Sequence, residues 1–145
     1  MELSGATKMN AKIFTVEQAN RIMPTIRSLY RDARNLQKEI RSRLMDWEFM
    51  HLEDDEGSPT EGRVLLKRHA LQSKIDRLVH KFNRRLELIE QLGGQVRDME
   101  TGTIEFYTVH EGRIVILSWR DGEDEISYWR EYKSAVDARR HLRDL

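Results

Sequence analysis

The sequence predicts an α+β protein, in which a long antiparallel two-helix hairpin carries a small antiparallel β-sheet. Apolar residues recur every three or four positions through residues 14–51 and again through residues 63–92, which is typical of two packed helices. Over residues 95–132 the pattern changes to alternating β-branched and aromatic residues, which is typical of strands. A chain of 145 residues is short enough for a single domain, so we expect only a flexible N-terminus (residues 1–13) and a tail (residues 133–145) beside these elements.

The first helix has a well-marked start. The Thr15 side chain can accept a hydrogen bond from the amide of Gln18 while the Gln18 side chain reaches back, and Phe14 precedes this capping box. Pro24 lies inside the helix and lacks an N–H, so we expect a kink there rather than an end. The apolar seam comprises Ile22, Ile26, Leu29, Ala33, Leu36, Ile40, Leu44 and Trp47.

The segment LEDDEGSPTEG, residues 52–62, contains Gly, Ser, Pro and acidic residues, which predicts an acidic loop between the helices. Gly93 and Gly94 follow the second helix and predict its end. The seam of this helix comprises Leu71, Ile75, Leu78, Phe82, Leu86 and Ile89.

The runs TIEFYTV and RIVILSW, separated by HEG, predict a β-hairpin. In the second run both faces are apolar, so we expect one face to cover the helices and the other to be covered by another part of the protein. A turn at Asp121 and Gly122 leads to EISYW, a possible third strand. The tail reads as a short helix or a frayed end.

Charge is sorted along the chain, although the formal net charge is +0. Residues 21–43 and 62–92 are basic, whereas residues 46–61 and 95–132 are acidic. Opposite blocks favour contacts between helices and acidic segments, within one chain or between copies. Because a two-helix hairpin and a small sheet leave apolar surface uncovered, we expect a homo-oligomer, most simply a dimer.

Basic residues form a stripe along each predicted helix, which is a pattern that nucleic-acid binding requires. The two stripes fall on opposite sides of an antiparallel hairpin, so nucleic-acid binding is the weaker alternative. The stripes comprise Arg27, Arg31, Arg34, Lys38 and Arg41 on the first helix, and Lys67, Lys74, Arg77, Lys81 and Arg84 on the second.

Other classes of site lack a signal. The chain has no cysteine, and no two of its histidines, His51, His69, His80, His110 and His141, have the i, i+4 spacing of a helical metal site. We therefore expect no metal and no cofactor. No apolar run reaches the ~20 residues of a membrane span and no signal peptide is recognisable, so we expect a cytoplasmic protein without membrane contact.

One segment, SWRDGEDEISYWREY, crowds aromatic and acidic residues together. It predicts either a ligand pocket with aromatic walls and few polar groups, or tryptophans that anchor the sheet while the acids occupy a turn. The candidate binding residues are Trp119, Arg120, Glu125, Tyr128, Trp129 and Glu131. No residue is assigned a catalytic role.

The segments FTVEQANRIMPTIR and LGGQVRDMETGTIEFYTVHEGRIVILSWRDGEDEISYWREY resemble the bacterial domain of unknown function 2203 family. The family pattern places a cysteine before the first of the two tryptophans and a histidine after the second, where this chain has Ser118 and Arg130. A later arginine of the pattern matches Arg139 or Arg140, and a glycine is lost. The resemblance implies no established activity, and any metal or redox chemistry that relatives perform with that cysteine and histidine is not open to this chain.

The leading hypothesis is a non-enzymatic protein-interaction or scaffold module that self-associates. The alternative is a small-ligand binding protein or an enzyme that uses residues 119–131.

Overall fold

The computed structural model describes residues 12–56 and 62–145, which form two compact units. The described part of the first unit holds residues 12–30 and 87–145, and the second unit lies within residues 31–86. The predicted flexible N-terminus up to residue 11, and residues 57–61 of the predicted acidic loop, lie outside the described residues.

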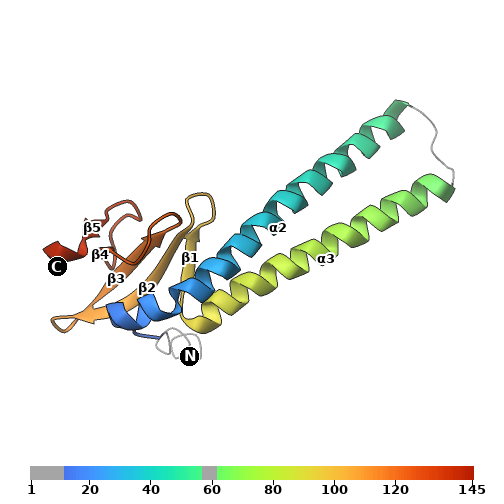
Figure 1. Ribbon diagram of the computed structural model, residues 1–145. Coiled ribbons are helices and arrows are strands. Elements are labelled where there is room, and N and C mark those ends of the chain that lie inside the picture. Colours follow the sequence, from blue (N-terminus) through green and yellow to red (C-terminus); the bar gives the residue numbers. More distant parts are fainter. Residues whose placement is uncertain (1–11, 57–61) are drawn as a thin grey trace, which may run out of the picture. The chain divides into compact units, whose positions relative to one another are not determined.

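The predicted α+β class is confirmed, because two helices pack together and five strands form one antiparallel sheet (Figure 1). The elements in chain order are α2 (Val16–Glu56), α3 (Gly62–Leu92), β1 (Gln95–Asp98), β2 (Thr103–His110), β3 (Arg113–Arg120), β4 (Tyr128–Glu131), β5 (Arg140–His141) and the 3₁₀ helix η1 (Leu142–Asp144).

The predicted capping box starts α2. The amide of Gln18 donates to Thr15 Oγ1 at 3.1 Å, and the amide of Thr15 donates to Gln18 Oε1 at 2.9 Å. Phe14 packs edge-on against Phe106 of the sheet, with ring centroids 5.3 Å apart. The helix continues through Pro24, as predicted.

The first helix ends later than predicted. It continues to Glu56 instead of residue 51, so the first residues of the predicted acidic loop are helical. Residues 52–56 contain no Gly or Pro, and Leu and Glu are good helix formers, so nothing in this stretch stops the helix. The second helix begins at Gly62, one residue before the predicted start.

In the second unit the helices bury Ala33, Ile75 and Leu78, all of which belong to the predicted seams. The predicted seam residues Leu36, Ile40 and Trp47 are half-buried, and Leu44 is exposed. Arg85 Nε also lies 3.5 Å from Asp32 Oδ2, which joins α3 to α2. This unit is a helix pair with a thin core.

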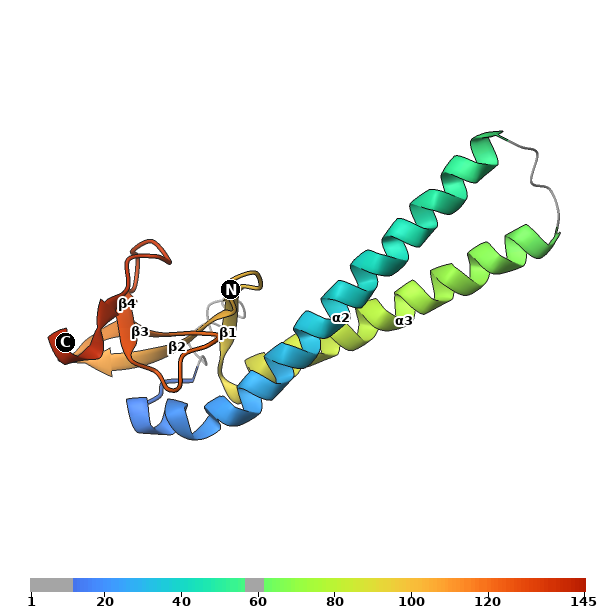
Figure 2. The same ribbon diagram turned by 45° about the horizontal axis from the view of Figure 1, so that its top comes forward.

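In the first unit α2 buries a stripe shifted from the predicted one. Ala19, Met23, Ile26 and Tyr30 are buried, whereas the predicted Ile22 is only half-buried. The shift arises because this part of α2 covers the sheet (Figure 2). The side chain of Ile26 packs near Gly94, next to Ile89 of α3 and Ile104 of β2.

The strands follow one another in the order β1-β2-β3-β4-β5, each antiparallel to the next. Because side chains alternate along a strand, this register defines two faces. The helix face carries Ile104, Phe106, Val115, Leu117, Trp119 and Trp129. The far face carries Glu105, Tyr107, Ile116, Ser118, Tyr128 and Arg130.

The sheet has two more strands than the predicted hairpin with its possible third strand. The third strand also starts three residues later than the predicted EISYW, at Tyr128. Its delay has a local cause, because the amide of Ile126 donates to Asn20 Oδ1 of α2 at 2.7 Å and is not available to β3. The additional strands, β1 and β5, have only four and two residues.

The tail, for which a short helix or a frayed end is expected, forms the two-residue strand β5 and the short 3₁₀ helix η1. Residues before β5 cover part of the far face. Arg130 Nη1 donates to the carbonyl of Ser134 at 2.8 Å, Arg120 pairs with Asp137, and Arg139 Nε donates to Ser118 Oγ at 3.0 Å. These contacts reach polar residues of the far face, whereas of its apolar residues on β3 Ile116 is buried and Ile114 is 45% exposed. The expectation that the second apolar face of β3 is covered stays a prediction.

A matched pair of glycine substitutions tests how tightly the turn after β1 packs. Gly102 and Gly112 have φ values of 68° and 77°. A Cβ at Gly102 would lie 2.7 Å from Asp121 Cβ and 2.9 Å from Tyr30 Oη, whereas a Cβ at Gly112 meets nothing within 4 Å. We expect Gly112→Ala to cost about 1 kcal/mol through backbone strain alone, and Gly102→Ala about 3 kcal/mol because Tyr30 must also move.

Urea unfolding followed by tryptophan fluorescence measures both costs. A Trp47→Phe background leaves Trp119 and Trp129, which both lie in the first unit. Equal losses in the two variants would contradict the close packing at Gly102.

Candidate functional site

The two predicted tryptophans lie on the helix face and are buried, with 0% of Trp119 and 2% of Trp129 exposed. Trp119 Nε1 donates to the carbonyl of Glu123 at 2.9 Å, and the Arg27 guanidinium carbon lies 5.5 Å from the Trp119 ring centroid. These contacts fix the turn after β3 to α2. The Trp119 ring therefore has no accessible surface for contact with a ligand.

The guanidinium carbons of Arg113 and Arg140 lie over the Trp129 ring, at 5.8 Å and 5.5 Å from its centroid. Glu131, another predicted site residue, pairs with Arg113. The buried indole N–H of Trp129 has no hydrogen-bond acceptor among residues 12–56 and 62–145. This cluster combines cation–π contacts with an ion pair at the edge of the helix face.

The remaining predicted residues lie elsewhere. Arg120 belongs to the far face, where it donates to Thr103 Oγ1 at 3.2 Å and pairs with Asp137. Glu125 and Tyr128 line an open hollow, together with Glu123, Asp124, Ser127 and His141. The register places Trp119, Trp129 and Glu131 on one face and Arg120 and Tyr128 on the other. The structure thus does not bring the six predicted residues into one site.

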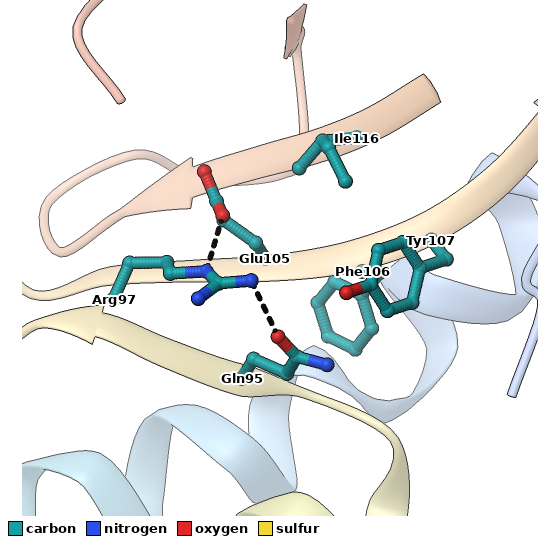
Figure 3. Close-up of a pocket in the computed structure, with 6 residues that line it drawn as sticks. All are labelled: Gln95, Arg97, Glu105, Phe106, Tyr107 and Ile116. Carbon is teal, nitrogen blue, oxygen red and sulfur yellow. Dashed lines mark hydrogen bonds and ion pairs between the residues drawn. The ribbon is translucent and has the colours of Figure 1, made fainter. Parts of the chain in front are cut away.

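A charged cluster that was not predicted from the sequence lies on the far face, and Figure 3 shows its residues Gln95, Arg97 and Glu105. The Glu105 carboxylate, only 2% exposed, accepts from Arg130 Nε at 2.7 Å and from Arg130 Nη2 at 2.9 Å. Arg97 Nε donates to the same carboxylate at 2.9 Å, and Arg97 Nη2 donates to Gln95 Oε1 at 2.8 Å. Two guanidinium groups therefore share one carboxylate.

The cluster joins three strands, because Arg97 belongs to β1, Glu105 to β2 and Arg130 to β4. Arg130 reaches across β3 to meet Glu105. Hydrogen bonding to Glu105 raises the pKa of Arg130 above its ordinary value, burial acts in the opposite direction, and the negative charge of Glu105 raises it further. Arg130 is therefore a permanent cation, as its buried bidentate contact requires.

Ser118 and Arg130, the positions at which the resemblance implies a cysteine and a histidine in relatives, lie on the same face of adjacent strands. Ser118 Oγ accepts from Arg139, and Arg139 Nη2 also donates to Glu123 at 2.7 Å and 2.9 Å. Arg139 and Arg140 are the two candidates for the later arginine that the resemblance implies; Arg139 donates to Ser118, whereas Arg140 lies over Trp129. Both positions thus carry structural hydrogen bonds in this chain.

The predicted basic stripes differ in their engagement. Arg27 Nη2 donates to the carbonyl of Asp124 at 3.0 Å, so the stripe on α2 starts with an arginine that holds the sheet. Lys38, Lys67, Lys74 and Lys81 are exposed. In the part of the chain that the structure describes, no three His, Asp or Glu side chains are arranged to hold a metal ion.

Removing the central carboxylate tests the cluster. Glu105→Gln leaves the buried Arg130 without a counter-charge, so we expect a loss of about 3–5 kcal/mol in the free energy of unfolding. Glu111→Gln, a control at a carboxylate with an 81% exposed side chain, should change it by less than about 0.5 kcal/mol. The double variant Glu105→Leu/Arg130→Met should lose less than Glu105→Gln, because it removes both buried charges. Urea unfolding in the Trp47→Phe background decides between these outcomes, and a double variant as unstable as the single one would contradict the electrostatic explanation.

The family model described as "Uncharacterized conserved protein (DUF2203)" matches residues 12–142. No curated protein and no solved structure matches the chain. The family match covers both helices and all five strands, and it confirms the resemblance in the two segments quoted from the sequence. The chain therefore belongs to the domain of unknown function 2203 family.

Proposed function

We propose that the chain is a non-enzymatic protein-interaction module that self-associates through one face of α2 in the second unit. The observation that carries this proposal is a stripe of three exposed apolar side chains, Met45, Phe49 and Leu52, whose exposed fractions are 62%, 63% and 62%. We call these three residues the α2 stripe. Spacings of four and three residues place them on one side of the helix.

The α2 stripe is distinct from the seam that packs against α3. At 3.6 residues per turn, Phe49 points about 200° away from Trp47, which is half-buried in the seam. This part of α2 therefore has two apolar faces, and α3 covers only one of them. A helix that is apolar on two sides is typical of a bundle with more helices than a single pair.

A second copy fits the α2 stripe because a two-fold axis would place the same three side chains opposite each other. Because the formal net charge is +0, electrostatic repulsion between two copies is weak. Full burial contributes about 1.5–3 kcal/mol for a large apolar side chain, whereas association costs about 4–15 kcal/mol. The combined contribution of the six side chains is therefore of the same order as the cost of association, so the loss of one from each copy should be measurable.

The contacts of the predicted pocket residues favour an interaction module over the small-ligand alternative. Trp119 and Trp129 are buried, and Arg120 is held by Thr103 and Asp137. These side chains support the sheet instead of facing a ligand. None of the described helices is both long enough and apolar enough to cross a bilayer. The cytoplasmic location expected from the sequence stays a prediction.

Charge placed in the α2 stripe tests self-association. Phe49→Glu should weaken the dimer at least about tenfold, because a carboxylate would be buried against its two-fold mate. Sedimentation equilibrium over a range of protein concentrations measures the dissociation constant. The matched control is Val79→Glu, which changes an exposed apolar residue of α3 in the same helix pair and should leave the constant within about twofold. A wild-type chain that stays monomeric at every concentration would contradict the proposal.

A further inference from the structure

The far face of the sheet is covered over only part of its area. Residues 134–139 contact it at Ser118, Arg120 and Arg130. Beyond them, toward the turn between β2 and β3, the same face carries half-exposed apolar and aromatic side chains. We call this surface the outer patch; it comprises Ile13, Tyr107, Val109, Ile114 and Tyr132.

The outer patch is continuous. Ile13 pairs with Tyr107 in an isolated parallel bridge, and Val109 pairs with Ile114 across the hairpin. The rings of Tyr107 and Tyr132 have centroids 6.1 Å apart. The exposed fractions are 49% for Ile13, 53% for Val109, 45% for Ile114 and 49% for Tyr132. Apolar surface that is grouped in this way, unlike scattered apolar residues, is typical of a binding surface.

A positive charge borders the outer patch. Two guanidinium groups share the Glu105 carboxylate, which leaves one positive charge in excess. Arg130 is buried, and its Nε, Nη1 and Nη2 atoms all donate hydrogen bonds within the protein. The side chain of Arg97 is 39% exposed, so the excess charge reaches solvent there.

The free polar groups around Arg97 are donors. Figure 3 shows the Arg97 guanidinium, the Gln95 amide and the Tyr107 hydroxyl around one shallow cleft, which Ile116 also lines. Arg97 uses Nε and Nη2 for Glu105 and Gln95, and within residues 12–56 and 62–145 its Nη1 has no acceptor. The Gln95 side-chain nitrogen and the Tyr107 hydroxyl likewise donate to no acceptor in that part of the chain. A carboxylate is the group that a guanidinium with adjacent neutral donors recognises.

We propose that this surface binds an extended acidic peptide segment of a partner protein, with a carboxylate at Arg97 and apolar side chains on the outer patch. Tyr107 connects the two parts, since it lines the cleft and belongs to the outer patch. Side chains at i, i+2 and i+4 of an extended peptide point the same way and span about 13 Å. Residues 105 to 109 of β2 span the same length, so an acidic residue with apolar residues two and four positions away fits this surface.

A peptide fits better than nucleic acid, because the cleft offers one excess positive charge and a phosphate backbone is bound through several spaced cations. The surface lies in the first unit and the α2 stripe in the second, so peptide binding and self-association can fail independently of each other.

Short peptides test the inference on the full-length protein. The probes are acetyl-Asp-Ala-Leu-Ala-Leu-amide, the same residues in reverse order, and the counterparts of both with Asn in place of Asp. Titration followed by amide chemical shifts in NMR spectra should give a dissociation constant of about 1 mM for an Asp peptide. The Asn counterpart should bind about tenfold more weakly, because it lacks the charge. The shifts should fall on β1, β2 and β3.

Three variants locate the contacts. Arg97→Gln should weaken the Asp peptide about tenfold and leave the Asn peptide unchanged. Val109→Ser should weaken both peptides, and Arg143→Gln, which removes an exposed charge in the same unit, should weaken neither. Tyr107→Phe, which keeps the ring, should weaken only the Asp peptide and guards against misfolding of Arg97→Gln. Equal binding of Asp and Asn peptides in both orders, the absence of binding, or shifts confined to the helix pair would overturn the inference.

Discussion

Glu105 carries a charged carboxylate inside a sheet, where a charge without partners would strongly destabilise the fold. Arg130 and Arg97 approach it from two other strands, and the remaining N–H groups of Arg130 hold the carbonyls of Glu131 and Ser134. Through these bonds, β1, β2, β4 and the segment after β4 are all connected to the Glu105 side chain, directly or through Arg130. The order of the far face, including how much of it the tail can cover, depends on this cluster.

The two faces of the sheet are covered by different kinds of interaction. On the helix face, apolar contacts with α2 dominate, and Phe14, Ile26 and Trp119 join helix to sheet. The far face is covered by a segment without regular structure, which arginine side chains attach through carbonyls and carboxylates. Hydrogen bonds and ion pairs from arginine side chains hold this segment, which has little apolar surface of its own. The covered area therefore extends only as far as these arginines reach. That boundary leaves the outer patch uncovered.

The parts of the fold that depend on neighbouring residues could be predicted from the sequence. The capping box of Thr15 and Gln18, the hairpin of β2 and β3 and the alternation of Ile104 and Phe106 with Glu105 follow from local patterns. Strands of four and two residues are too short to show such periodicity. β1 and β5 can therefore be recognised only from their pairing with neighbouring strands in the structure. The end of α2 at Glu56 does not follow from the sequence, because acidic residues occur in loops and in helices alike.

The site was harder to predict than the fold. Two pairs of predicted site residues are adjacent in sequence: Trp119 with Arg120, and Tyr128 with Trp129. Because adjacent residues of a strand point to opposite faces of the sheet, the two members of each pair lie on different faces. Glu105 and Arg130 lie 25 residues apart, and their contact depends on which strands flank β3. One signal was present: Glu105 lies between Ile104 and Phe106 in an otherwise apolar run, where a charge calls for a buried partner.

The lengths of the outermost strands bear on how the protein avoids aggregation. A sheet grows by adding strands to an exposed edge, and long, regular edges promote such growth. Here one edge strand has four residues and an irregular register near Val96, and the other has two residues. Next to the start of β1, where β2 continues past its partner, the amide of Phe14 donates to the carbonyl of Tyr107. The sheet can therefore expose apolar side chains on one face while its edges offer a poor template for fibril growth.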